Sequence, residues 1–451
     1  MGKKWLKILG VTISILILIG LTLISTVDRT PYQKMPYYEK TIDAFSALQP
    51  TITTGDTLKV GWSRVSLVPE ETVPLSGYGK RRGAHYSGIH DSVYVRAFVF
   101  DNGLSKATYV SADLLIVPPL VYERIFELLD SEDFNPDNTF LTATHSHSSI
   151  GGWQPGIVGR LFSGEFDLDM VEFIAQQIAT AIEGASEETS QAQIGYSAVM
   201  AADLVRNRLV GDQVGQIDPW FRIIKIIKDN GEVGLLTSFA AHATCTGGSF
   251  MELSADYPGL MVKMLEADST IDFASYGAGA VGSMAPLAPR LDDLEEIKYI
   301  ASNLVPQIML IQNATPTDYT TELGFAREKV ELRVPHFRIS ENLRLRPWVF
   351  EQVFGEVEAT VNALKIGDQL LIGTPADFSG ELIEPLSNLA RTQGHHLMVH
   401  SFNGSYMGYV TKDEWYDLDK YETRTMNWFG PYNGDYFSEL ISVLITKFSV
   451  E

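Results

Sequence analysis

Two histidines stand where an apolar segment of the sequence ends. His145 and His147 lie in the run Thr-His-Ser-His-Ser at residues 144–148, directly after the apolar residues 139–143. Alternating histidines on a strand place both rings on one face, so the pair is either a metal site or a hydrogen-bonded surface pair. The segment alone does not decide between these two interpretations.

Further side chains with metal-binding chemistry follow other apolar runs. His242, Asp377 and Tyr409 each come after a strand-like run. Ligands gather where the strands of an open α/β sheet end, so we expect these side chains to meet His145. Imidazole and carboxylate suit Zn²⁺, and a zinc ion with an open position activates water for amide hydrolysis. The HExxH motif of common metalloproteases is absent from the sequence.

The order of the predicted elements favours an α/β domain with a mixed β-sheet core, flanking helices and a zinc site at strand ends. β-branched and aromatic runs predict strands, and amphipathic runs predict helices. The predicted strands are 58–65, 93–101, 107–111, 193–196, 222–228, 234–240, 331–338, 357–366, 369–373 and 397–402. The predicted helices are 37–48, 121–129, 170–183, 258–266 and 380–392.

Composition is typical of a folded, enzyme-sized protein. The chain has 451 residues, 45% hydrophobic content and a formal net charge of -21. A nucleic-acid-binding protein needs a basic face, so we expect no nucleic-acid partner. The single cysteine, Cys245, excludes an intramolecular disulfide, and we interpret it as a small packed residue.

The N-terminus predicts a membrane anchor. Lys3, Lys4 and Lys7 precede an uncharged run from Ile8 to Ile24, which is near the length of a transmembrane helix. A cleaved signal peptide is the alternative, although its apolar region is usually shorter. We predict an anchor at residues 1–27, a stalk at 28–57 and one domain at 58–451. The positive-inside rule would place that domain on the periplasmic or extracellular side.

Several blocks along the chain resemble the catalytic domain of the neutral/alkaline non-lysosomal ceramidases. Their order and spacing agree with that family, which is more specific than the two histidines alone. The blocks are Leu58 to Val65, Leu75 to Tyr78, Gly88 to His90, Arg96 to Val99, Thr142 to Ser148, Phe239 to Thr244, Ser254 to Asp256, Gly373 to Phe378, Tyr406 to Thr411, Tyr421 with Glu422, and Phe429 to Pro431.

The resemblance implies a set of site residues. Zn²⁺ would be bound by His145, His242, Asp377 and Tyr409, where Tyr409 is preferred over Tyr406 for its spacing to Tyr421. Taken alone, without the resemblance, Tyr409 would be interpreted as a packed aromatic residue at a strand end, and the arginines could equally be surface charges. The remaining predicted roles are His147, Arg208 and Asp256 in catalysis, and Arg206, Tyr421, Gly279 and Ser283 in substrate binding.

Three departures from the family pattern bear on the mechanism. Asp377 stands where the family carries a glutamate, which is one methylene longer. The family loop Ser-Asn-Val-Gly-Asp is matched by residues 279–283, so Gly279 occupies the position of the essential serine. Ser283 is either a substitute hydroxyl or a turn serine. The C-terminal immunoglobulin-like domain of the family has no counterpart, because the catalytic match extends to near the end of the sequence.

The function implied is zinc-dependent cleavage of the N-acyl amide bond of ceramide-like lipids, giving fatty acid and a sphingoid base. His147 and Arg208 would stabilise the oxyanion, and Asp256 would either transfer protons or cap the helix that begins near Pro258. Two alternatives stay open: hydrolysis of another exported amide or ester, and a catalytically silent protein that binds zinc and lipid.

Overall fold

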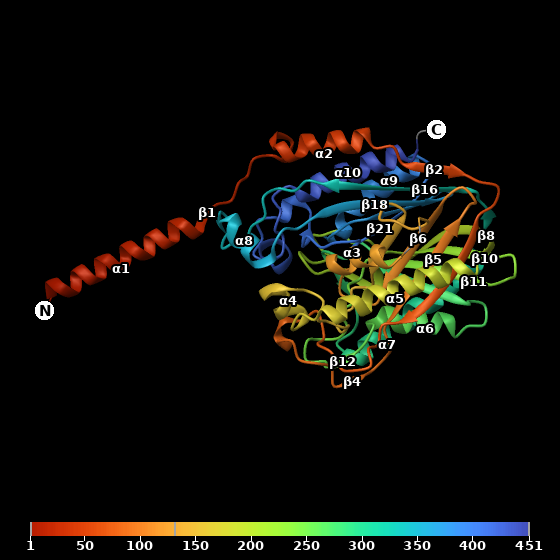
Figure 1. Cartoon of the computed structure of the whole chain (residues 1–451), viewed down its shortest axis with the longest axis horizontal. Helices are drawn as coiled ribbons and strands as arrows, with labels where there is room; N and C mark the ends of the chain where they lie inside the picture. The colour runs from red at the N-terminus through yellow and green to blue at the C-terminus, as the bar shows by residue number, and fades with distance from the viewer. Residues whose placement is uncertain (1, 130–131, 450–451) are drawn as a thin grey trace.

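Two β-sheets lie face to face in the computed structural model, and helices cover the outer face of each (Figure 1). The structure describes residues 2–129 and 132–449. One hydrophobic core fills the space between the two sheets. A second core lies between the larger sheet and its helices, and a third lies between the smaller sheet and its helices. The chain is therefore layered as helices, sheet, sheet and helices.

The larger sheet contains nine strands and is mixed. Its order is β13-β11-β10-β8-β3-β5-β6-β7, with β15 paired to β8. The β11–β13 and β6–β7 pairs are parallel, and the other pairs are antiparallel. The strands are β3 (Lys59–Ser66), β5 (Tyr94–Asp101), β6 (Lys106–Ala112), β7 (Thr139–Ala143), β8 (Ser190–Met200), β10 (Trp220–Lys228), β11 (Val233–Phe239), β13 (Phe273–Ala278) and β15 (Asp318–Tyr319).

The smaller sheet has the order β2-β16-β18-β19-β21. Its strands are β2 (Thr51–Thr54), β16 (Glu322–Val330), β18 (Ala359–Ile366), β19 (Gln369–Gly373) and β21 (His396–His400). Four short pairs lie outside both sheets: β1 (Ile24–Thr26) with β17 (Leu343–Leu345), β4 (Gly88–Ile89) with β12 (Glu252–Leu253), β9 (Val205–Asn207) with β14 (Met284–Pro286), and β20 (Asp377–Phe378) with β22 (Tyr409–Val410).

Helices close both outer faces. Those on the larger sheet are α3 (Pro119–Leu128), α5 (Leu168–Glu187), α6 (Asp256–Glu266) and α7 (Asp293–Ala314). Those on the smaller sheet are α2 (Pro36–Ala47), α9 (Ile383–Thr392) and α10 (Asn433–Lys447). At one end of the molecule lie α1 (Gly2–Leu23), α4 (Gly156–Ser163) and α8 (Pro347–Phe354).

Strand β5 contributes side chains to two hydrophobic cores, because successive side chains of a strand point to opposite faces. In β5, Val95, Ala97 and Val99 face the helices, whereas Phe98 and Phe100 face the other sheet. Successive side chains of a strand point to opposite faces, so an almost wholly apolar strand must be covered on both. The predicted α/β architecture with a mixed sheet is confirmed.

The two edges of the larger sheet approach each other, and this brings the strand ends together. Ser111 Oγ of β6 donates to the carbonyl of Tyr276 in β13, although these strands stand near opposite edges. The end of β21 lies between the edges, because Thr142 Oγ1 donates to Ser401 O (2.8 Å) and Ser401 N donates to Ala278 O (3.0 Å). The ends of β7, β11, β13 and β21 consequently meet in one place.

The structure corrects the N-terminal prediction. No helix in the described part of the chain is long and apolar enough to cross a membrane, so the predicted transmembrane helix is wrong. Helix α1 carries Lys7 and ends at Leu23, which leaves an uncharged stretch of about 24 Å at the 1.5 Å helical rise, short of the ~30 Å hydrocarbon core. The domain boundaries and the extracytoplasmic location stay predictions.

A second correction concerns residues 331–338, which form no strand. The strand of this region is β16, which ends at Val330. Pro335 has no N–H to donate to a ladder, which agrees with the irregular backbone of this segment.

Candidate metal centre and active site

Three imidazoles converge at the meeting point of the strands. His145 and His147 follow the end of β7, and His242 follows the end of β11. One nitrogen from each ring lies within 4.8 Å of the others, and His145 Nε2 is 2.9 Å from His147 Nε2. The three rings therefore share one small volume.

Backbone carbonyls fix the orientation of two of the rings. His145 Nδ1 donates to Leu115 O (2.6 Å), and His242 Nδ1 lies 2.8 Å from Val281 O and 3.0 Å from Met284 O. Because each Nδ1 carries the proton, each Nε2 presents a lone pair to the shared volume. The ring of Phe402 stacks on the face of the His145 ring, with centroids 3.8 Å apart, and restricts its rotation.

Asp377 adds a carboxylate oxygen to the same volume. Its Oδ1 lies 3.0 Å from His242 Nε2 and 3.8 Å from His145 Nε2, and accepts no hydrogen bond from the described residues. Its Oδ2 accepts from Tyr406 Oη at 2.7 Å. One oxygen is thus held by a donor while the other remains directed at the imidazole nitrogens.

These residues fit a metal ion. Lone pairs of two imidazoles and a buried carboxylate oxygen repel one another unless a cation lies between them. Two nitrogens and one carboxylate oxygen, each oriented by a hydrogen bond to its other heteroatom, match the ligands and the supporting contacts of a catalytic zinc site. The described residues can therefore hold a metal ion.

The protonation states agree with metal binding. Burial lowers the pKa of His145 to about 3, and it lowers the pKa of His147 and of His242 well below the usual range. All three rings are consequently neutral near neutral pH, which is the form that coordinates metals. His145 also adopts a left-handed backbone conformation, with φ of 63°, a strained geometry that is concentrated at functional sites.

Arg208 and Tyr409 lie beside the three histidines. Arg208 Nη2 donates to Tyr409 Oη (2.8 Å) and is 3.5 Å from His242 Nε2. Tyr409 Oη is itself 3.4 Å from His242 Nε2. The Arg208 guanidinium is held on its other side by Glu422, whose Oε1 is 2.8 Å from Arg208 Nε. This arrangement places a fixed positive charge next to the candidate metal position.

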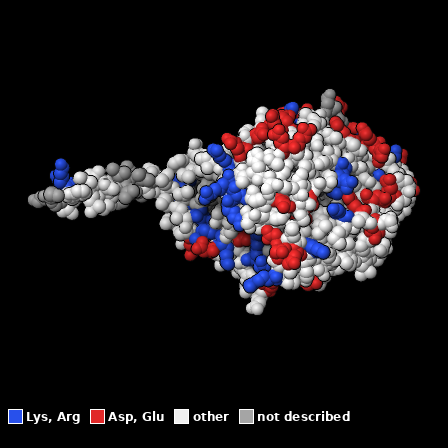
Figure 2. Space-filling model, turned by 90° about the horizontal axis from the view of Figure 1, so that it is seen from below, with Lys and Arg blue, Asp and Glu red and all other residues white. Residues whose placement is uncertain are grey.

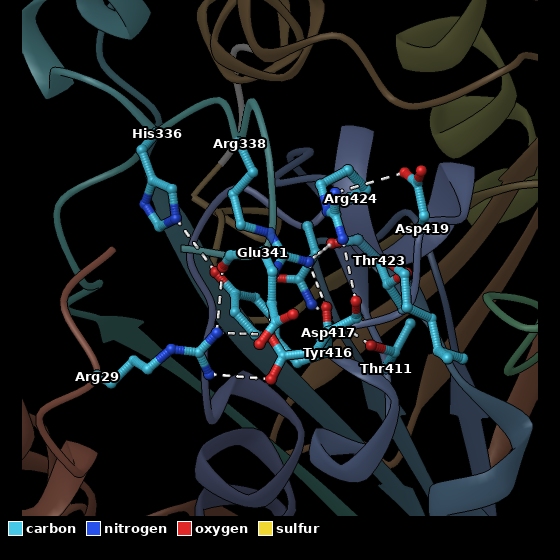
Figure 3. Close-up of polar contacts among 12 residues, drawn as sticks. Arg29, His336, Arg338, Glu341, Thr411, Tyr416, Asp417, Asp419, Thr423 and Arg424 are labelled. Carbon is cyan, nitrogen blue, oxygen red and sulfur yellow. Dashed lines mark hydrogen bonds and ion pairs between the residues drawn. The ribbon is translucent and has the colours of Figure 1, made fainter. Parts of the chain in front are cut away.

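A polar network holds the segment that carries Glu422. Tyr421–Thr425 forms a π-helical turn, η6. Arg338 donates to Thr423 O at 2.6 Å and lies 3.6 Å above the ring of Tyr416, and Asp417 accepts two hydrogen bonds from Arg29 (Figure 3). Contacts from residues far away in the sequence therefore fix the turn that carries Glu422, and so the position of its carboxylate beside Arg208.

A deep cavity of about 940 Å³ opens above the histidines. Its inner wall includes His145, His147, Asp377, Arg208 and Tyr409. Apolar side chains form most of the remaining wall, among them Ile116, Phe126, Trp153, Phe162, Phe354 and Trp428. The candidate metal-binding side chains thus line a cavity whose wall is mainly apolar, although charged residues such as Glu123, Arg327 and Glu358 also line it.

The other predicted site residues lie in different surroundings. Tyr421 lines the cavity, with its ring 5.9 Å from that of Tyr409. Arg206 is exposed and does not line the cavity. Asp256 is buried, and its carboxylate accepts hydrogen bonds from Thr246 N (3.1 Å) and Thr246 Oγ1 (3.2 Å) rather than facing the histidines.

The loop at residues 279–283 supports the site without lining it. Ser283 Oγ is hydrogen-bonded to Ser379 Oγ. A Cβ atom on Gly279 would lie 2.8 Å from Phe239 O, so a serine there requires the backbone to move. The same loop supplies the Val281 carbonyl that orients His242.

Sequence reasoning missed two residues that shape the site, Glu422 and Phe402, and set aside a third, Tyr406, as the alternative to Tyr409. Tyr406 and Glu422 lay inside blocks that resembled the family, yet no spacing rule pairs Glu422 with Arg208 across the chain. Phe402 adopts a left-handed φ of 59°, which the sequence of an ordinary aromatic residue does not signal.

The chain is similar in sequence to proteins named neutral ceramidase. Residues 68–286 match the family described as neutral/alkaline non-lysosomal ceramidase, N-terminal. The neutral ceramidase of Pseudomonas aeruginosa is 25% identical over 255 residues, which are 53% of this chain and 36% of that protein. The neutral ceramidase of Mycobacterium tuberculosis is 25% identical over 232 residues, 48% of this chain and 36% of that protein. The match thus spans about a third of each relative.

Solved structures show the same fold. The crystal structure of neutral ceramidase from Pseudomonas aeruginosa has a TM-score of 0.76 at 19% identity and covers 88% of this chain and 75% of that one. A ceramidase complexed with C2 has a TM-score of 0.74 at 19% identity, over 86% of this chain and 74% of that one. The predicted resemblance to neutral ceramidases is confirmed.

Proposed function

We propose that this chain is a zinc-dependent amidohydrolase that cleaves the N-acyl amide bond of ceramide-like lipids to a fatty acid and a sphingoid base. One observation carries the proposal: the nitrogens of His145 and His242 and an oxygen of Asp377 converge in the wall of a large, mainly apolar cavity. The relatives named neutral ceramidase support the choice of substrate class.

The cavity fits a lipid substrate. Each buried CH₂ group contributes roughly 0.8 kcal/mol to binding, so a long acyl chain against the walls formed by Trp153, Phe162 and Trp428 supplies most of the affinity. A lipid whose acyl chain lies along the apolar wall can place its amide group beside the histidines.

The residues around the amide have separate roles in this proposal. His145, His242 and Asp377, with Tyr409 alongside, would hold the zinc ion, and a zinc ion bound there would supply an activated water and polarise the carbonyl. Arg208 directs Nη2 toward the same point and stabilises negative charge on the carbonyl oxygen. His147 Nδ1 has no hydrogen-bond partner among the described residues, so it is available to accept a proton and deliver it to the leaving nitrogen.

One observation favours a second candidate, hydrolysis of a different amide or an ester. The position of the family serine is Gly279, and the hydroxyl of Ser283 is hydrogen-bonded to Ser379 outside the cavity. The loop at residues 279–283 consequently places no hydroxyl beside the amide. A substrate whose hydrolysis needs no such hydroxyl would fit the site equally well.

A substrate panel separates these functions. Purified full-length chain is incubated with N-acylsphingosine, with short-chain acyl amides and with the corresponding esters, each with chelator and after zinc is restored. The proposal predicts chelator-sensitive release of fatty acid from N-acylsphingosine. Turnover of only the short acyl compounds supports the second candidate, and zinc and lipid binding without any product would identify a lipid-binding protein.

A further inference from the structure

Helix α4 exposes apolar side chains at the mouth of the cavity. Val158 and Phe162 line the cavity. Ile157 and Leu161, on the solvent side of the same helix, are 76% and 47% exposed. A helix at the surface of a soluble domain normally turns polar residues to water, so this second apolar face indicates contact with something apolar.

Unneutralised cations surround this apolar ridge of Ile157 and Leu161. Arg160 lies between the two residues on α4, and Lys80 and Arg82 lie on and just after the short helix η2 (Gly79–Arg81), which packs against α4. All three side chains are exposed, and among the described residues none of them forms an ion pair. The ridge is therefore bordered by positive charge.

The charge is segregated on a strongly acidic protein. Figure 2 shows Lys and Arg gathered in a band near the base of α1, while Asp and Glu lie mainly farther along the body. The net charge of -21 would repel the rest of the surface from an anionic layer. Only an orientation that turns a basic, apolar face toward that layer is favourable.

We propose that the ridge of Ile157 and Leu161 docks on the surface of an anionic lipid bilayer, with Lys80, Arg82 and Arg160 against its phosphate groups. In this position the mouth of the cavity faces the bilayer, and a lipid enters along Val158 and Phe162 without crossing water. The inference deepens the proposed function, on which it rests for the identity of the lipid that enters.

The test places a fluorescent reporter on the ridge. Cys245 is the one cysteine of the chain and is buried, so an environment-sensitive dye can be attached selectively to Ile157→Cys. The matched control is Leu310→Cys on α7, where the native side chain is 71% exposed. Vesicles of phosphatidylcholine with phosphatidylglycerol are compared with vesicles of phosphatidylcholine alone.

The proposal predicts a shift of emission to shorter wavelength for the dye at position 157 with anionic vesicles only, and none at position 310. Adding Lys80→Glu or Arg160→Glu should weaken the vesicle affinity about fivefold for each cation removed, whereas Lys298→Glu on α7 should not. No shift at position 157, equal shifts at both positions, or equal shifts with both vesicle types would overturn it. The fluorescence shift does not depend on turnover of a substrate. Hydrolysis of N-acylsphingosine in detergent micelles therefore tests the proposed function separately.

Discussion

Two cavities lie on either side of one strand end, and they differ in how their charges are satisfied. His145 lines the large apolar cavity, and the preceding residue, Thr144, lines a second cavity of about 580 Å³. In the second cavity Glu266 pairs with both Arg96 and Arg64. In the first, Oδ1 of Asp377 accepts no hydrogen bond from the described residues, although it lies 3.0 Å from His242 Nε2.

The difference shows which buried polar groups are available for chemistry. Charged groups that are already paired with each other hold a local arrangement in place and are not available to bind a ligand. Lone pairs that are oriented but unpaired cost free energy until a cation or substrate satisfies them. Of these two cavities, the one around Asp377 therefore has the character of a catalytic site.

The largest effect is expected from removing the charge of Asp377. Asp377→Asn keeps the size of the side chain but weakens metal binding, so the bound metal should be lost and hydrolysis should fall by about 100-fold or more. The measurements are metal content by elemental analysis and initial rates of fatty acid release. Asp113→Asn, in the second cavity, is the matched control and should keep its metal.

A smaller loss is expected at Arg208. Arg208→Ala removes the charge beside the carbonyl oxygen, and the loss of one such group costs on the order of 100-fold in kcat. Arg206→Ala, two residues away and exposed, should stay near the wild-type rate. Equal losses in the two variants would contradict the placement of Arg208.

Glu422 should affect the rate through Arg208. Glu422→Gln removes the charge that holds Arg208 Nε at 2.8 Å, and we expect kcat to fall about 10-fold because the guanidinium is less well fixed. Metal content should be unchanged, and Glu422→Gln should add little in the background of Arg208→Ala. Additive losses in that double variant would show that Glu422 acts independently.

The smallest effect concerns stability in the second cavity. Burial raises the pKa of Asp113 to about 7, above its unfolded value near 4. Between about pH 4 and pH 7 the unfolded chain loses this proton before the folded chain does, so this group lowers stability as pH rises. Asp113→Asn should therefore be more stable than wild type at about pH 8 and nearly as stable as wild type at about pH 4.

Urea unfolding across this pH range measures that difference. A difference between the two proteins that does not change with pH would show that Asp113 does not titrate in the window.

The sequence predicted local features better than long-range ones. The apolar runs before His145 and His242 are strands, because their periodicity and β-branched content are local properties. The approach of β13 and β7, which closes the sheet and joins the two histidines, depends on curvature and on the insertion of Ser401 between the edges. No local pattern encodes that arrangement.

The same limit applied to individual side chains. Arg206 and Arg208 are equivalent by residue type, but Arg206 lies within β9 whereas Arg208 follows the end of that strand, and the sequence does not show where β9 ends. At the N-terminus, counting apolar residues led to a wrong transmembrane prediction, because the count took no account of where the helix ends.

The most direct test of the central claim is anomalous diffraction at the zinc absorption edge from crystals of the zinc-loaded chain. We expect one strong peak about 2.0–2.2 Å from His145 Nε2, His242 Nε2 and an oxygen of Asp377. A zinc-loaded crystal without a peak among these three side chains, or with the ion bound elsewhere, would contradict the account.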